Sequence, residues 1–214
     1  MRLHSIEDQA SLTPELALSF LKEGNKRFVE NLKAHSNLLE QVNNTKENQF
    51  PFAIILSCID SRTSAELIFD QGLGDVFSTR IAGNVLNDDI IGSMEFACKL
   101  AGSKLIVVLG HSNCGAITGA CKGTELGHLT HLLSKVDSAV QQVKKNNIDI
   151  DITSKEAVDK VSLQNVMYTL NNVLDRSEVL QNMFKNGEIG LVGAYYKVET
   201  GEVDFVKELF TSKE

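Results

Sequence analysis

The stretch FAIILSCIDSR (residues 52–62) places a thiol, a carboxylate and a guanidinium directly after an apolar run without charge. Residues 52–57 are almost continuously apolar, whereas a strand with one exposed face alternates apolar and polar residues. Such a run predicts a buried strand of a parallel sheet. Cys58, Asp60 and Arg62 would then follow its carboxyl end, where open α/β sheets bind their ligands.

Further apolar runs occur along the chain, with helical patterns between them. Strands are expected over 52–57, 75–80, 104–110 and 191–198, and a turn at 200–202 returns the chain as a strand over 203–206. Helices are expected over 64–71, 88–102, 115–122, 125–146 and 154–185. Near the N-terminus, Thr13-Pro14 is typical of a helix start.

This alternation of strands and helices decides the fold class, because it is typical of parallel sheets that helices cover on both faces. We expect an α/β fold: a mostly parallel central sheet of four strands with one antiparallel edge strand, helices on both faces and an N-terminal helical arm. We expect a single domain over 1–214, with the arm at 1–50, the α/β core at 51–206 and a tail at 207–214.

Composition excludes several classes of protein. The formal net charge is −7, which argues against a general nucleic-acid binder, because such proteins need a basic surface. The chain lacks an apolar run near the roughly 20 residues of a membrane span, and its N-terminal stretch does not resemble a signal peptide. Four cysteines are too few for a disulfide framework in 214 residues. We therefore expect a cytoplasmic protein without membrane or nucleic-acid partners.

A second reactive cluster follows the third expected strand, at residues 110–115 (GHSNCG). If the first and third strands are neighbours, Cys58, His111 and Cys114 converge, and two thiolates with one imidazole match a catalytic zinc site that keeps an open fourth position. Each part alone has a simpler explanation, since a free cysteine at a strand end is usually a small buried residue. Their combination favours zinc.

The remaining candidates are weaker. Cys98 and Cys121 lack polar company and are assigned to packing. His128 and His131 lie three residues apart on an expected helix, so they could pair on a metal, but a solvated or packed face is favoured. Neither Gly72-Leu73-Gly74 nor the glycines of 110–115 complete a nucleotide-binding motif.

Asp60 and Arg62 share one side of the chain if the segment stays extended. Arg62 can then clamp Asp60 through two parallel hydrogen bonds, which would keep the carboxylate off the metal and leave the fourth position to water. The alternative is an ordinary structural ion pair, which the spacing does not exclude.

Three motifs occur in order: Cys58–Arg62, Arg80–Asn84 and Gly110–Ala116. Together with the stretches at 24–28, 92–97, 193–196 and 200–201, they resemble the β-class carbonic anhydrases. The resemblance implies one zinc ion per subunit on Cys58, His111 and Cys114, with Asp60 as a further ligand only in a closed form. It implies that zinc-bound hydroxide attacks CO2 to give bicarbonate and a proton, the carbonate dehydratase (zinc lyase) reaction, with Asp60 and Arg62 as catalytic residues.

Local residues indicate the plant-type subgroup of that family. The resemblance implies a substrate pocket lined by five residues: Gln49, Phe77, Ala82, Phe96 and Gly115. The other subgroup carries a non-catalytic bicarbonate site that uses a tryptophan and a glycine before the first cysteine. Ile55 and Ser57 occupy those positions here and the chain has no tryptophan, so we expect no such site.

The resemblance also implies a homodimer or homotetramer whose active sites draw residues from both chains. An apolar set on the N-terminal helix would cross onto the partner or, in the simpler alternative, cover its own sheet: Leu16, Phe20, Phe28 and Leu32. Two other functions compete with CO2 hydration. One is hydrolysis of CS2 or carbonyl sulfide at the same zinc ligands, and the other is a non-catalytic zinc-binding protein with Asp60 permanently on the metal.

Overall fold

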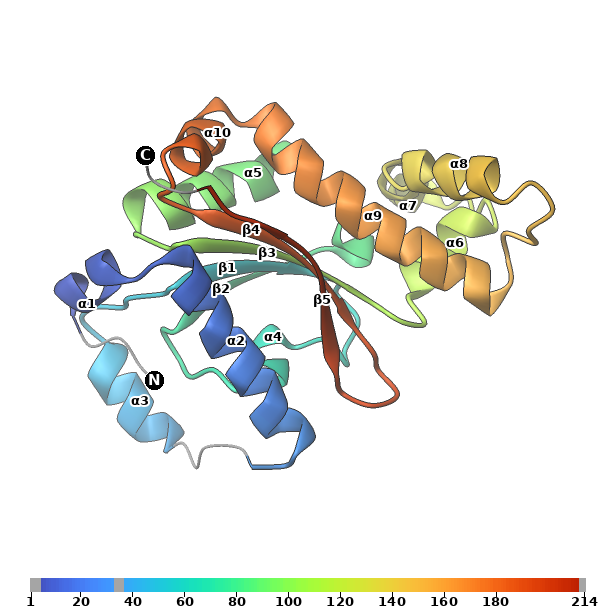
Figure 1. Ribbon diagram of the computed structural model, residues 1–214. Coiled ribbons are helices and arrows are strands. Elements are labelled where there is room, and N and C mark those ends of the chain that lie inside the picture. The colour runs from blue at the N-terminus through green and yellow to red at the C-terminus, as the bar shows by residue number, and fades with distance from the viewer. Residues whose placement is uncertain (1–4, 33–36, 212–214) are drawn as a thin grey trace.

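The computed structural model describes residues 5–32 and 37–211, which form a five-stranded sheet with strand order β2-β1-β3-β4-β5 (Figure 1). The strands are β1 (Ala53–Ser57), β2 (Val76–Arg80), β3 (Leu105–His111), β4 (Gly190–Tyr196) and β5 (Val203–Leu209). The first four are parallel, and β5 pairs antiparallel with β4. The predicted α/β fold with a mostly parallel sheet and one antiparallel pair is confirmed. β5 ends at Leu209 rather than at residue 206, because it pairs with β4 as far as Leu191.

The helices are α1 (Ile6–Ser11), α2 (Pro14–Val29), α3 (Leu38–Thr45), α4 (Ala65–Ile68), α5 (Asp88–Glu95), α6 (Gly115–Cys121), α7 (Gly127–Ser134), α8 (Asp137–Asn146), α9 (Lys155–Arg176) and α10 (Glu178–Lys185). A short 3-10 helix, η1 (Ala82–Asn84), follows β2, and a π-helix, η2 (Phe96–Leu100), continues α5. Within the described ranges, none of them is both long enough and apolar enough to cross a membrane.

Two helices expected to be continuous are each divided in two. The pattern over 154–185 breaks at Ser177, whose hydroxyl accepts a hydrogen bond from the Leu180 N–H at 3.1 Å and so starts α10. The pattern over 125–146 breaks between α7 and α8, where the Val136 N–H donates to the Leu133 carbonyl at 2.9 Å in a tight turn.

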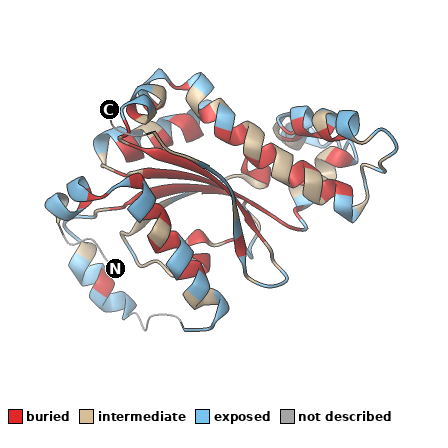
Figure 2. Ribbon diagram, viewed as in Figure 1, coloured by how far each residue is buried: buried red, intermediate tan, exposed pale blue. Residues whose placement is uncertain are grey.

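Helices cover both faces of the sheet, and alternate residues of β1 enter separate cores. Ala53 and Ile55 pack with residues of α2 and α4, whereas Ile54 and Leu56 pack with α5, α9 and α10. Figure 2 shows the central strands as buried along their length. A third core lies beyond the strand ends, around α6, α8 and α9, and it contains Cys58.

The N-terminal helix α2 covers its own sheet, which is the simpler of the two alternatives. Its buried face includes Leu18, Phe20 and Leu21, all in contact with the first core. Leu16 and Leu32 lie elsewhere, with 46% and 64% of their surface exposed. Of the apolar set expected to act together, Phe20 is therefore fully packed in its own chain and Phe28 partly so.

Gly24 and Asn25 interrupt the helical pattern of α2 for a structural reason. A Cβ at Gly24 would lie 1.8 Å from the Phe69 carbonyl oxygen, so only glycine fits this close approach. The buried Asn25 amide donates to the carbonyls of Ile68 and Gly201, at 3.1 and 2.9 Å. This pair of residues therefore ties α2 to the end of α4 and to the turn before β5.

Candidate metal centre

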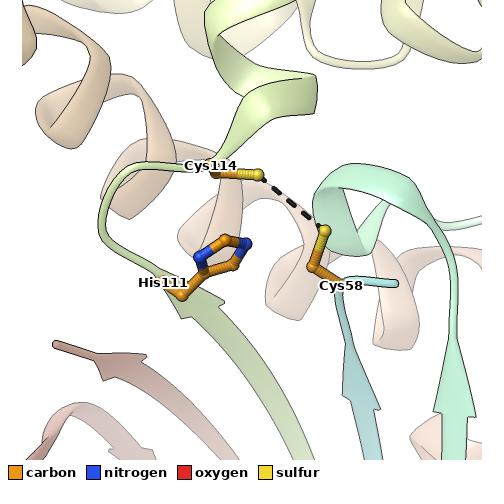
Figure 3. A group of neighbouring side chains, drawn as sticks. All are labelled: Cys58, His111 and Cys114. Atoms are coloured by element: carbon orange, nitrogen blue, oxygen red, sulfur yellow. Dashed lines mark hydrogen bonds between the residues drawn. The ribbon is translucent and has the colours of Figure 1, made fainter. Parts of the chain in front are cut away.

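The metal centre forms where two neighbouring parallel strands end. β1 and β3 pair from Ala53↔Leu105 to Ser57↔Leu109, so Cys58 and the end of β3 emerge at the same edge of the sheet. One ligand atom each from Cys58, His111 and Cys114 lies within 4.8 Å of the others, and all three residues are buried. Figure 3 shows the His111 ring pointing toward the two sulfur atoms. The predicted convergence is confirmed.

His111 is oriented for a metal ion. Its Nδ1 lies 2.8 Å from the Ser112 carbonyl, which can only accept, so Nδ1 carries the proton and Nε2 carries a lone pair. That Nε2 is buried and has no hydrogen-bond partner among the described residues. A buried polar atom without a partner is unfavourable, and a cation between Nε2 and the two sulfurs would satisfy it.

The donor set fits zinc. The Sγ atoms of Cys58 and Cys114 lie 3.9 Å apart and share a hydrogen bond. This contact lowers the pKa of the Cys58 thiol and raises the pKa of the Cys114 thiol, which burial raises further. Two thiolates and one imidazole are one of the ligand sets of catalytic zinc sites, in which a fourth position stays open.

Asp60 and Arg62 form the predicted clamp. Arg62 Nε donates to Asp60 Oδ1 at 2.8 Å and Arg62 Nη2 donates to Oδ2 at 2.7 Å. The side-chain hydrogen bonds from Arg62 hold the pKa of Asp60 well below its usual range. The segment is not extended, however, because the Thr63 N–H donates to the Asp60 carbonyl at 2.9 Å and closes a turn. The turn brings the two side chains together as an extended segment was expected to do.

Arg80 is a site residue to which sequence reasoning assigned no role. Its Nε donates to the Cys58 carbonyl at 3.0 Å, and its Nη2 donates to the Asp60 carbonyl at 2.6 Å. The guanidinium thus holds the backbone on both sides of Ile59. The signal was present in the sequence, because Arg80 opens the second family motif.

A hollow of about 490 Å³ lies beside the metal ligands. Its lining includes Cys58 and Asp60 together with Ala82 and Gly115, two of the five predicted pocket residues. Most of the remaining wall is apolar and comes from α6 and α7, including Leu129. The structure therefore places a largely apolar space next to the thiolates and the clamped carboxylate.

The other three predicted pocket residues lie elsewhere in the chain. The rings of Phe77 and Phe96 meet edge to face, with centroids 6.1 Å apart, and both line a separate hollow of about 700 Å³. This hollow shares no lining residue with the one at Cys58. Gln49 is exposed in the segment before β1 and lines neither hollow.

The weaker candidates take no part in the centre. Burial raises the pKa of the Cys98 thiol to about 12 and also raises that of Cys121, as expected of packing residues. His128 and His131 are exposed on α7, and they belong to no metal-binding group within the described part of the chain.

A protein-family model described as carbonic anhydrase matches residues 53–203, which include the whole metal centre. The chain belongs to the carbonic anhydrase family. Carbonic anhydrase 2 of Mycobacterium tuberculosis is 35% identical over 189 residues, covering 88% of this chain and 90% of the relative. The carbonic anhydrase of Mycolicibacterium smegmatis is 33% identical over 197 residues, covering 92% and 95%.

Solved structures place this carbonic anhydrase in the β class. The β-carbonic anhydrase CcaA has 27% identity and a TM-score of 0.71, with 88% of this chain and 98% of that one covered. The Coccomyxa β-carbonic anhydrase, solved in complex with acetazolamide, has 25% identity and a TM-score of 0.72, with 90% and 88% covered. Cys58, His111 and Cys114 are the zinc site of this carbonic anhydrase, and its reaction is the reversible hydration of CO2 to bicarbonate and a proton.

Proposed function

We propose that this carbonic anhydrase works with an open fourth zinc position, and that Asp60 and Arg62 are its catalytic side chains. The observation that carries the proposal is the two-pronged clamp of Arg62 on Asp60 beside the three ligands. Zinc, when bound, lowers the pKa of a coordinated water to about 7 and so supplies hydroxide near neutral pH. The remaining steps belong to the side chains of the chain itself.

Asp60 orients the attacking oxygen. An ionised carboxylate can only accept hydrogen bonds, so the O–H of the nucleophile donates to Asp60, and this hydrogen bond directs a lone pair of the nucleophile toward CO2. Arg62 keeps Asp60 in that state, because both carboxylate oxygens accept from the guanidinium. Arg80 supports the same arrangement by holding the Cys58 and Asp60 carbonyls. Asp60 would ligate zinc only in a closed form that breaks its pair with Arg62.

CO2 binds in the hollow beside Cys58 and Asp60, against Ala82 and Gly115. The mostly apolar wall from α6 and α7 suits an uncharged substrate and disfavours bulk water. Bicarbonate carries a charge that the apolar part of this wall does not pair with, and it leaves when water replaces it.

The pocket is of the plant type and is completed by a second copy of the chain. Phe77 lies on the edge strand β2 and Phe96 is 54% exposed, so their hollow is open in a single chain. We infer that these two rings, with Gln49, cover the metal centre of the partner in a homodimer or homotetramer. Ile55 and Ser57 leave no place for the non-catalytic bicarbonate site of the other subgroup.

The location proposed from the sequence is the cytoplasm. All four cysteines are free thiols, and two of them are zinc ligands that must be reduced to bind the metal. A reducing compartment suits both facts.

Stopped-flow CO2 hydration between pH 6 and 9, with zinc content measured on the same samples, tests the proposal. The wild-type protein should carry about one zinc per chain and hydrate CO2 faster as pH rises through about 7. Asp60→Asn should keep its zinc and lose roughly 10- to 100-fold in kcat. Asp175→Asn, an exposed carboxylate on α9, serves as the matched control and should change neither.

Two outcomes contradict the proposal. If the zinc-loaded protein is inactive on CO2 but hydrolyses carbonyl sulfide or CS2, then CO2 is not its substrate. Normal turnover of Asp60→Asn would reduce the Asp60–Arg62 pair to a structural ion pair.

A further inference from the structure

One face of α9 carries polar side chains that reach the two loops of the metal centre, residues 82–84 beside Cys58 and residues 111–114. These residues recur every three or four positions, the spacing of one helical face: Lys155, Asp159, Ser162, Asn165 and Thr169. Three of them are almost completely buried, with exposures of 1% for Ser162, 2% for Asn165 and 4% for Thr169. A buried polar stripe on a helix needs partners, and here the partners are backbone groups of the metal loops.

Asn165 holds the loop that contacts the Cys58 sulfur. Its Nδ2 donates to the Gly83 carbonyl at 2.8 Å, and the Gly83 N–H donates to Cys58 Sγ at 3.3 Å. Gly83 and Asn84 both have left-handed backbones, with φ of 68° and 43°. Left-handed residues other than glycine are strained and persist only where surrounding contacts hold them. Asn165 supplies one such contact, and the Thr169 hydroxyl supplies another by donating to the Asn84 carbonyl at 3.5 Å.

Ser162 and Asp159 hold the second loop. The Ser162 hydroxyl donates to the carbonyl of the ligand His111 at 3.1 Å. Asp159 Oδ1 accepts from the Asn113 N–H at 3.4 Å and from the Tyr195 hydroxyl at 2.9 Å. Asn113 is also left-handed, with φ of 55°, and it lies directly before the ligand Cys114.

The outer end of the stripe joins the turn after β4. Lys155 Nζ pairs with Glu199 at 3.2 Å. Glu199 accepts from the Ser112 hydroxyl and from the Asn113 amide, each at 2.7 Å. The segment 111–114 is therefore held from α9 directly and through Glu199.

We propose that the polar stripe of α9 positions the zinc ligands, and that Asn165 is its principal positioning residue. One rigid helix sets the distance between the loop that contacts Cys58 and the loop that carries His111 and Cys114. Partners behind the ligands of a metal commonly set its affinity, and losing one costs roughly 10- to 100-fold. A stripe that only stabilised the fold would leave the affinity for zinc unchanged.

The test measures metal binding rather than CO2 hydration, so its failure is separable from that of the Asp60 mechanism. Asn165→Leu removes the donor at similar volume, and Asn171→Leu is the matched control on the exposed face of the same helix. Zinc affinity is measured by competition with a chelator. The melting temperature is measured with and without zinc, and the thiolate-to-cobalt absorption band on the Co²⁺-substituted protein.

The expected result for Asn165→Leu is a zinc affinity about 10- to 100-fold lower, a smaller rise in melting temperature on adding zinc, and a shifted cobalt band. Asn171→Leu should match the wild type in all three. A wild-type zinc affinity and cobalt band in Asn165→Leu, whatever its melting temperature, would overturn the proposal.

Ser162→Ala keeps the test decisive if Asn165→Leu does not fold. It removes one hydroxyl from the His111 carbonyl and only one atom from the core. We expect a severalfold loss of zinc affinity, and an unchanged affinity with an unchanged cobalt band would count against the positioning role.

Discussion

The metal centre and the hollow lined by Phe77 and Phe96, here called the aromatic hollow, lie on the same sheet. They differ in how completely one chain surrounds them. β1 and β3, which lead to the metal centre, are buried at every position. A side chain of β2 holds the loop that follows β1, and a side chain of α9 holds the loop that follows β3. β2, which carries Phe77, is an edge strand without a fully buried residue. The ligand set is therefore complete within one chain, whereas the aromatic hollow lacks a cover.

The difference follows from the chemistry of the two places. Zinc ligands must be preorganised, so their loops need rigid hydrogen bonds from the same chain. An apolar wall needs only a surface to cover it, and a second copy of the chain can provide that surface. Two predictions test the metal centre and its loops, and one tests the hollow of Phe77 and Phe96, from the largest expected effect to the smallest.

Removing a zinc ligand should abolish the metal centre altogether. Cys114→Ala should lose bound zinc and more than about 100-fold in CO2 hydration, since even losing a residue behind a ligand costs 10- to 100-fold. Metal analysis and stopped-flow assays measure both effects. Cys98→Ala, a buried cysteine outside the centre, should keep both zinc and activity. Full zinc in Cys114→Ala would show that the ligand assignment is wrong.

Combining two variant chains in one dimer should reveal whether the aromatic hollow covers the metal centre of the partner. Phe77→Ala should keep its zinc and lose roughly 10-fold in activity, because the wall over the substrate is opened. Co-expression with Asp60→Asn should then restore activity, since one site of each mixed dimer would combine an intact Asp60 with an intact Phe77. Activity no higher than the mean of the two variants would place both residues in the same site.

Acid should weaken the Glu199 contact at the rim of the metal loop. The Ser112 hydroxyl, followed by its own backbone, Lys155 and Asn113, holds the pKa of Glu199 at about 2, below its usual 4.5. A carboxyl group with a lowered folded pKa contributes stability above its unfolded pKa, and this contribution is lost as pH falls from about 4.5 toward 2.

Melting temperatures of the zinc-free wild type and Glu199→Gln measure this effect. At pH 7 the wild type should melt roughly 1–2 °C higher, a small gap because Glu199 is exposed. At pH 3 the gap should narrow, and at pH 7 high salt should reduce it. If the difference in melting temperature is equal at pH 7 and pH 3, the Glu199 carboxylate is not one of the contacts that hold the loop.

Much of the metal centre was predictable because its signals are local. The continuous apolar runs of β1 and β3 indicated buried strands, and the donors that follow them indicated a ligand site. The Arg62–Asp60 clamp was predictable for the same reason, since the two partners are only two positions apart in the sequence. The helices at 125–146 and 154–185 were predicted too long, because a single serine such as Ser177 is a weak signal for a break.

The support behind the ligands was not predictable. Asn165 and Gly83 lie 82 positions apart, and a polar residue on a helical face usually indicates solvent rather than a buried contact. The separation of Phe77 and Phe96 from Ala82 and Gly115 was equally hidden, since it depends on which residues line each hollow in the folded chain and not on a local pattern.

By itself, the sequence determined the buried strands, the donors at their ends and the α/β alternation, because periodicity and spacing act over a few residues. Tertiary structure alone decided that β1 lies beside β3, that His111 directs Nε2 at two sulfurs, and that α9 holds both loops. These features depend on strand pairing and helix packing between distant segments, which no local pattern of residues records.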